Sequence, residues 1–156
     1  MLTLHKPSVE DLWFKEQLLQ DAATMSYNHA YGGTIPFPPE KWADWHRRWL
    51  QVPETQRYYR YVAAGGRFVG EIAYRYEEER HIYMADVIIH AAFRNKGYGR
   101  QALLLLCQQA AEHGVRELYD DIASDNPAIT IFTRCGFAEV CRTDTCITMK
   151  KQLLFP

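Results

Sequence analysis

Hydrophobic residues recur along this chain with two different periods, and these periods separate predicted helices from predicted strands. Apolar positions at helical spacing, bounded by capping or breaking residues, predict helices over residues 8–20, 39–49, 101–113 and 126–135. Alternating or continuous apolar runs between turn residues predict strands over residues 2–5, 58–64, 67–76, 81–90, 116–122, 137–142 and 145–151.

The order of these elements predicts the fold class. One strand and two helices precede three strands, and Gly65-Gly66 supplies a two-residue turn for an antiparallel hairpin. A helix, a strand, a short helix and a final hairpin follow. This order predicts a mixed α/β (α+β) fold, with a central sheet flanked by about four helices. Residues 1–156 are expected to form a single domain.

Two aromatic stretches stand beside each other in the first third of the chain. Residues 27–39 are rich in glycine and proline and are predicted to be a loop. Trp42, Trp45 and Trp49 follow at helical spacing, which is typical of a helix face packed into a core. Tyr27, Asn28 and Tyr31 lie in the loop, where side chains that select a ligand are often found.

Composition and charge exclude several classes of protein. The 18 basic and 19 acidic residues nearly cancel, to a net charge of −1, whereas nucleic-acid binders carry a basic excess. The longest aliphatic run, residues 103–106, is far shorter than the ~20 residues of a membrane span, and we expect no signal peptide. The four cysteines form no CxxC pair and no zinc spacing, so we expect no metal and a cytoplasmic location.

The stretch of residues 94–100 is the strongest sign of chemistry. It follows a predicted strand, precedes a helix and contains Gly97 and Gly99, which allow the backbone to approach a ligand closely. The helix behind it would present free N–H groups and its positive dipole end to an anion. Arg94, Lys96 and Arg100 add positive charge, so the stretch is typical of a pyrophosphate site.

Two motifs resemble those of the GCN5-related N-acetyltransferases, or GNAT family. The pattern [RQ]xxGxG/A is matched from Arg94 to Gly99, and a later pattern ending in Gly-Phe is matched by residues 125–137. The resemblance implies a GNAT-like sheet with a splayed parallel strand pair, and acetyl-CoA as co-substrate bound between those strands. The residues that would then contact acetyl-CoA are Val87, Ile88, Ile89, Arg94, Asn95, Lys96, Gly97, Tyr98, Gly99, Arg100, Asn126 and Phe132.

The chain departs from the family pattern at two positions. Phe132 occupies the place of a frequent tyrosine that is thought to protonate the departing thiolate, and phenylalanine has no proton to give. Tyr119 and Ser124 are candidate replacements, and protonation by water is the alternative. The family asparagine falls on Asp125 or Asn126, depending on the end from which the motif is counted, and we prefer Asn126.

Transfer to an amine requires a base, because an alkylamine with a pKa near 10.4 is almost wholly protonated at neutral pH. Asp86 lies just before Val87 on the strand expected to hold the cofactor, and Glu71 lies on its neighbour. Both are predicted catalytic candidates. Tyr27, Asn28 and Tyr31 are predicted to bind the acceptor.

The predicted function is transfer of an acetyl group from acetyl-CoA to a primary amine, most simply that of a small molecule. The alternatives are acetylation of a protein N-terminus or lysine, and a non-catalytic domain that binds acyl-CoA. The resemblance also implies a homodimer, for which the final hairpin is a candidate surface.

Overall fold

All seven strands in the computed structural model, which describes residues 1–154, belong to one sheet with the order β1-β2-β3-β4-β5-β7-β6. Neighbouring strands are antiparallel except for β4 and β5, which are parallel. The strands are β1 (Leu2–His5), β2 (Arg57–Ala64), β3 (Arg67–Glu77), β4 (Ile82–Ile89), β5 (Glu117–Ala123), β6 (Ala138–Arg142) and β7 (Cys146–Gln152).

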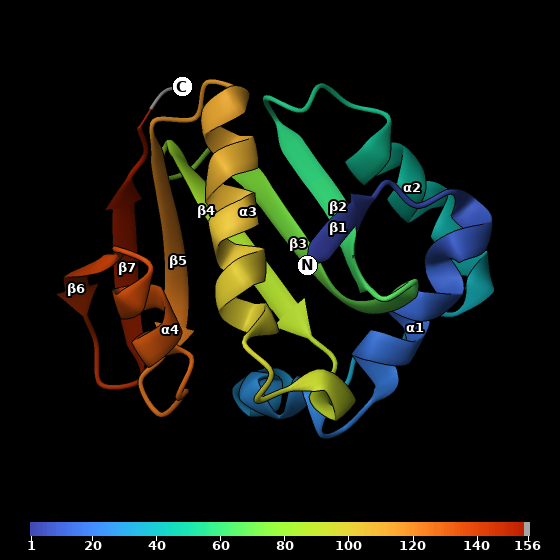
Figure 1. The fold of residues 1–156 in the computed structure, drawn as a ribbon. Helices are drawn as coiled ribbons and strands as arrows, with labels where there is room; N and C mark the ends of the chain where they lie inside the picture. The colour runs from blue at the N-terminus through green and yellow to red at the C-terminus, as the bar shows by residue number, and fades with distance from the viewer. Residues whose placement is uncertain (155–156) are drawn as a thin grey trace.

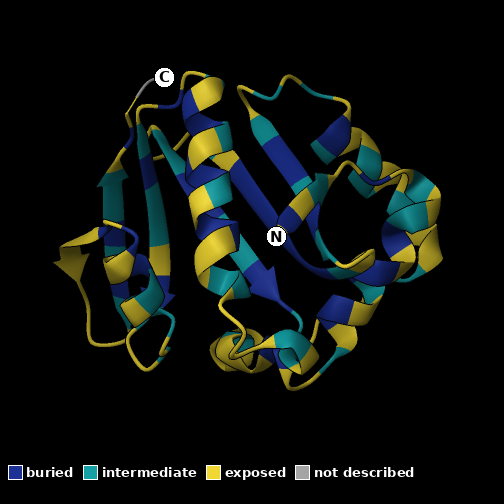
Figure 2. Ribbon diagram, in the orientation of Figure 1, coloured by how far each residue is buried: buried dark blue, intermediate teal, exposed yellow. Residues whose placement is uncertain are grey.

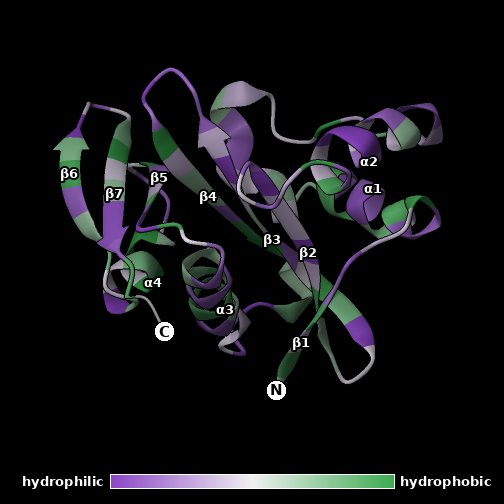
Figure 3. Cartoon of the chain, turned by 90° about the horizontal axis from the view of Figure 1, so that it is seen from above, coloured by the Kyte–Doolittle hydropathy of each residue, from purple (hydrophilic) through white to green (hydrophobic). Residues whose placement is uncertain are grey.

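Helices cover both faces of this sheet. The α-helices are α1 (Trp13–Gln20), α2 (Trp42–Leu50), α3 (Tyr98–Glu112) and α4 (Ile129–Arg134). The 3-10 helices are η1 (Val9–Leu12), η2 (Thr24–Tyr31), η3 (Pro39–Lys41) and η4 (Ala91–Phe93). Helices α3 and α4 lie on one face, called the α3 face below, and α1 and α2 lie on the other, called the α1 face (Figures 1 and 3).

Each face has its own hydrophobic core. On the α3 face, Leu103 and Leu106 of α3 are fully buried against strand residues that include Ile72. On the α1 face, Phe14 and Leu18 of α1 pack with aromatic residues of β2. The central strands are buried on both sides, while the outward turns of α3 are exposed (Figure 2). Two layers of helices on one sheet therefore stabilise its middle, where β3 and β4 lie.

The predicted order of strands and helices is confirmed, and so is the packing of the tryptophan stripe. Trp42, Trp45 and Trp49 are partly buried against the core of the α1 face. The loop prediction for residues 27–39 is wrong at its start, because η2 extends to Tyr31. The residues of η2 contain no glycine or proline, which permits a helix, and Gly32, with a φ of 97°, ends it.

Among residues 1–154, no helix has both the length and the apolar character that crossing a membrane requires.

Candidate active site

The parallel strands β4 and β5 touch only near their beginnings. Tyr83 pairs with Leu118 and Met84 with Tyr119, and no further pair joins the two strands, although β4 continues to Ile89. The β5-facing backbone groups beyond Met84 therefore lack a strand partner. Unpaired N–H and C=O groups on a strand can hold an extended ligand in the way that a neighbouring strand would. We call this place the β4–β5 split.

The beginning of α3 has the geometry of an anion site. Gly97, with a φ of 82°, is the N-cap of this 15-residue helix, and Asn95 also has a positive φ, of 64°. These left-handed residues turn the chain so that the first N–H groups of α3 face outward. Lys96 and Arg100 are exposed beside them. The donors and charges therefore fit a pyrophosphate.

Arg94, which is expected to contact the cofactor, is hydrogen-bonded within the protein. Its guanidinium donates to the backbone carbonyls of Ala23 and Thr24, at 3.1 and 2.8 Å. The Thr24 hydroxyl in turn accepts a hydrogen bond from the Ala91 N–H at 2.9 Å. Arg94 thus connects the start of η2 to the loop that precedes α3 by hydrogen bonds, and these two segments form one structural unit.

Asp86 lies on β4 beside the split and faces the α1 side of the sheet, across from Ala73 of β3. Its carboxyl is half-buried. Burial and the negative charge of Glu71 raise the pKa of Asp86 to about 6, while the positive charges of Lys15 and Arg75 lower it. A carboxyl with a pKa near 6 is largely ionised at neutral pH, yet basic enough to accept a proton from an amine.

Glu71 is engaged in a buried network. Its side chain is 2% exposed, and Oε1 accepts hydrogen bonds from Lys15 Nζ at 3.0 Å and from the Tyr59 hydroxyl at 2.7 Å. The Lys15 ammonium also lies 4.8 Å from the ring centre of Trp45. The lysine that compensates Glu71 is therefore held by an aromatic ring as well as by the carboxylate. This arrangement favours Asp86 over Glu71 as the base.

Replacing Glu71 with glutamine should destabilise the protein strongly. The substitution keeps the Tyr59 hydrogen bond but leaves the Lys15 ammonium without its buried counter-ion, which costs about 3 kcal/mol. Urea unfolding measures this loss as a lower midpoint with an unchanged slope. The double variant Lys15→Met/Glu71→Gln should recover most of it. An unchanged midpoint in the single variant would contradict a stabilising role for the ion pair.

Of the three predicted acceptor residues, only Tyr27 is influenced by the charges of the carboxyls. Burial and the charges of Asp86, Glu71 and Asp120 raise the pKa of Tyr27. Asn28 instead donates through Nδ2 to the Gly33 carbonyl at 2.8 Å. Tyr31 is 87% exposed and points away from the described core.

The far end of the split is bridged by a contact between η2 and the loop after β5. His29 Nε2 lies 3.1 Å from Asp125 Oδ2, and both side chains are exposed. Asn126 uses its Oδ1 to accept a hydrogen bond from the Ala128 N–H at 2.9 Å, which fixes the turn into α4. An exposed pair of this kind adds little stability, but it shows that η2 extends across the split (Figure 1).

The two candidate replacements for the missing acid each have contacts of their own. Tyr119 is paired with Met84 at the closed end of the split, and Lys150 approaches its ring to 5.7 Å. Ser124 donates to the Asp144 carbonyl at 3.2 Å in the final hairpin. Phe132 is buried against Phe137, with ring centres 5.0 Å apart.

Sequence reasoning missed Asp120 and Lys15. Asp120 is half-buried on β5, and burial together with the charge of Asp86 raises its pKa well above the usual value. The sequence did indicate Asp120, because it alternates with Leu118 and Ile122 along the strand and therefore shares their buried face. Lys15 likewise interrupts the apolar face of α1. A charged residue at a buried position is informative in both cases.

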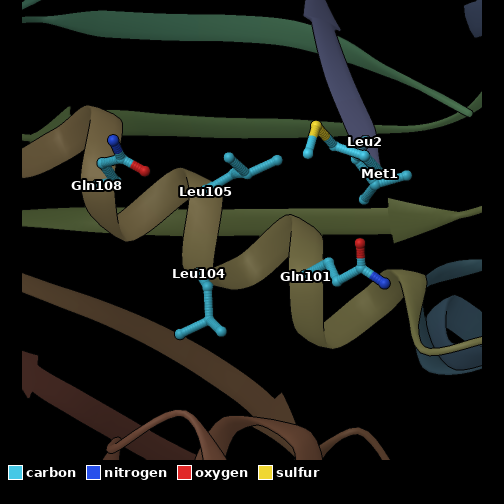
Figure 4. Close-up of a pocket in the computed structure, with 6 residues that line it drawn as sticks. All are labelled: Met1, Leu2, Gln101, Leu104, Leu105 and Gln108. Atoms are coloured by element: carbon cyan, nitrogen blue, oxygen red, sulfur yellow. The ribbon is translucent and has the colours of Figure 1, made fainter.

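Two hollows on the described surface lie elsewhere. One, of about 250 Å³, separates β1 from α3, and Figure 4 shows its apolar and glutamine side chains. Another, of about 480 Å³, lies between α1, the β2–β3 turn and η4. Neither is lined by Asp86 or Tyr27, so neither bears the chemistry described above. Among residues 1–154, no group of three or more His, Cys, Asp or Glu side chains is arranged to hold a metal ion.

Comparison with solved structures identifies the fold. Spermidine N-acetyltransferase from Vibrio cholerae, solved with CoA and spermine, superposes with a TM-score of 0.80 at 18% identity, over 97% of this chain and 95% of that one. The ribosomal L7/L12 α-N-protein acetyltransferase RimL, solved with coenzyme A, gives 0.79 at 12% identity, over 97% and 94%. The structure of yncA from Salmonella typhimurium with its cofactor acetyl-CoA gives 0.72 at 20% identity, over 98% and 94%.

These neighbours share the overall fold of this chain, and each is named as an acetyltransferase. The family model of the GNAT acetyltransferases matches residues 16–137. The chain therefore belongs to the GNAT family, and it is an acetyl-CoA-dependent N-acetyltransferase. No curated protein matches its sequence.

Proposed function

We propose that this enzyme acetylates the primary amine of a small molecule by direct attack on acetyl-CoA. The observation that carries the proposal is Asp86, a half-buried carboxyl with a pKa of about 6 at the β4–β5 split. When bound, acetyl-CoA supplies an activated acetyl thioester. The remaining requirements are to hold that co-substrate, to bind an amine beside it, and to remove a proton from the amine.

The residues for holding acetyl-CoA come from two elements. The unpaired edge of β4, from Val87 to Ile89, would bond the extended pantetheine arm as a further strand does. The N-terminus of α3 behind Gly97, with Lys96 and Arg100 beside it, would bind the pyrophosphate. Both sites lie next to the split, which supports one continuous binding path along it.

The amine would enter from the α1 face, where Tyr27 and Asp86 meet. The Asp86 carboxylate attracts an ammonium ion and accepts its proton, so that nitrogen attacks in the neutral form. The Tyr27 ring and hydroxyl provide an apolar wall and a hydrogen bond for the acceptor. The contact between His29 and Asp125 closes this side of the split, which favours a small acceptor over a long peptide.

Gly97→Trp should abolish binding of acetyl-CoA at the start of α3. The space around a Cβ at Gly97 is open, with only Gln101 Nε2 at 3.8 Å, so an indole ring would occupy the place proposed for the pyrophosphate. We expect an affinity loss of about 100-fold, measured by calorimetric titration. Gly114→Trp is the matched control, because Gly114 also has a positive φ and open surroundings but lies at the opposite end of α3. It carries the same backbone strain, about 1–2 kcal/mol, without touching the site.

Release of CoA in the presence of amines separates the proposal from its alternatives. Amine-dependent release by the wild type, with small amines preferred to peptides, supports the proposed reaction. Preference for a peptide N-terminus or a peptide lysine would replace it with protein acetylation. Binding of acetyl-CoA without release from a broad panel of amines would favour a non-catalytic acyl-CoA-binding domain. The homodimer and the cytoplasmic location stay predictions.

A further inference from the structure

Asp120 is the first residue of β5 beyond the last pair that joins it to β4. That pair is Met84 with Tyr119, and Asp86 is the second residue of β4 beyond it. Asp86 and Asp120 are therefore the first carboxyls on the two strands where these separate. The Asp120 carboxyl forms no ion pair with any of residues 1–154, and the same holds for Asp86.

The two carboxyls point to opposite faces of the sheet. Asp86 shares its side with Ile88, which packs in the core of the α1 face. Asp120 stands between Leu118 and Ile122, and both of these pack in the core of the α3 face, as does Phe132 of α4. A thioester lying in the split would therefore have Asp86 on the side from which the amine arrives and Asp120 on the other.

We propose that Asp120 is the proton donor to the departing thiolate, and that Asp86 and Asp120 form an acid–base pair across the split. This inference rests on the proposed function. Once the proton that Asp86 takes from the ammonium ion has passed to solvent, the neutral amine nitrogen bonds to the carbonyl carbon as the carbon–sulfur bond breaks. Asp86 takes one proton from nitrogen, and Asp120 gives one proton to sulfur. The two carboxyls together hold one proton, which is on Asp120 before the reaction and on Asp86 after it. Transfer of this proton from Asp86 back to Asp120 restores the starting state.

The protonation states required by this step agree with the surroundings of each carboxyl. Burial and the negative charge of Asp86 raise the pKa of Asp120 well above its usual range, whereas the pKa of Asp86 is about 6. The negative charge of ionised Asp86 therefore favours the protonated form of Asp120. The titratable and charged groups that interact electrostatically with Asp120 are Asp86 on β4, Arg75 on β3, Tyr27 on η2, Cys146 on β7 and Asp121 on its own strand.

Other groups near the split are poorer donors. Phe132 has no proton to give. Burial and neighbouring carboxyls raise the pKa of Tyr27 above the usual value of about 10, so transfer from its hydroxyl to a thiolate of pKa about 8.5 is unfavourable. A buried carboxylic acid with a raised pKa is better matched to a thiolate, because a carboxyl group is intrinsically a stronger acid than a tyrosine hydroxyl.

The experiment compares the kcat and the pH–rate profile of Asp120→Asn with those of Asp121→Asn. Calorimetric titration first establishes that both variants bind acetyl-CoA with equal affinity. Asp121 is the matched control because it lies on the same strand but faces the other side, where it pairs with Arg80 at 2.8 Å. We expect Asp120→Asn to lower kcat by about 100-fold and to remove the alkaline limb of the pH–rate profile. Asp121→Asn should stay within about twofold of the wild type. Infrared spectroscopy of the free protein at about pH 7.5 should show a protonated carboxyl that only Asp120→Asn loses.

The outcomes separate this inference from the proposed function. Asp120→Asn with the wild-type rate and an unchanged alkaline limb would overturn the role of Asp120 while leaving the acetyl transfer intact. A wild type without the protonated carboxyl band would overturn it as well, whether or not turnover is seen. A wild type that binds acetyl-CoA but releases no CoA with any amine would instead contradict the proposed function.

Discussion

Asp86→Asn should lower kcat/KM by about 10²- to 10⁴-fold at neutral pH, which is the usual contribution of a general base. Asparagine keeps the shape of the side chain but cannot accept a proton. The loss should shrink as pH rises, because amine with a pKa near 10.4 then becomes neutral in solution. On the acid side the wild-type rate, in contrast, should fall as pH drops through about 6, the pKa of Asp86. Steady-state rates from acid to alkaline pH measure both profiles.

The same variant should be more stable than the wild type above pH 6. The folded-state pKa of Asp86 is raised from 3.8 to about 6, so protonation stabilises the folded protein at low pH and that stabilisation is lost as pH rises through 6. Asparagine carries no charge to desolvate at any pH. A higher Tm at about pH 8 together with a lower rate would therefore identify a catalytic group rather than a stabilising one.

Two results would contradict this role for Asp86. One is a variant whose rate stays within a few-fold of the wild type at neutral pH. The other is a low rate accompanied by a lower Tm at every pH, which would mean that the substitution damages the fold. The alkaline rescue is the more specific readout, because a misfolded protein does not regain activity as the amine deprotonates.

Periodicity predicted the strands and long helices of this fold well, because each element is a simple amphipathic or buried segment. The α3 core positions Leu103 and Leu106 and the buried positions of β5 follow directly from spacing. The 3-10 helix η2 could not be read in this way. It depends on tertiary contacts, chiefly the hydrogen bonds from Arg94 to the carbonyls of Ala23 and Thr24.

The site was harder to predict than the fold. Alternation along a strand indicates the face of the sheet to which a side chain points, but not the residues that it contacts. Asp86 was found from its place before the apolar end of β4. Glu71 was indistinguishable from it until Lys15, 56 positions away in sequence, proved to occupy its carboxylate. Asp120 needed the register of β4 with β5, which no local pattern contains. Long-range pairing, rather than local propensity, therefore determines which carboxyls are ion-paired and which lie beside the split.

Gly70→Ala should cost about 4 kcal/mol of unfolding free energy, at the upper end for a point substitution. A Cβ at position 70 would lie 2.2 Å from the Ile88 carbonyl oxygen and 2.8 Å from Ile89 Cδ1. Carbonyl oxygen in a paired strand cannot rotate away as a side chain can, so β3 and β4 must move apart. Gly70 pairs with Ile89, at the end of β4 that borders the split. Urea unfolding measures the stability loss, and calorimetric titration the accompanying loss of acetyl-CoA affinity.

Gly99→Ala is the matched control for this effect. Its Cβ would meet only Ile131 Cδ1, at 3.4 Å, and its φ is ordinary for an L-residue. Alanine is also favoured over glycine in a helix by about 1 kcal/mol, so stability should rise slightly. A lower unfolding free energy for Gly70→Ala and a higher one for Gly99→Ala would show that the loss at Gly70 comes from contact with the Ile88 backbone. The addition of a methyl group alone would not explain it. A loss of less than about 1 kcal/mol for Gly70→Ala would mean that β4 can shift freely, and it would then be unfit to hold a thioester in register with Asp86.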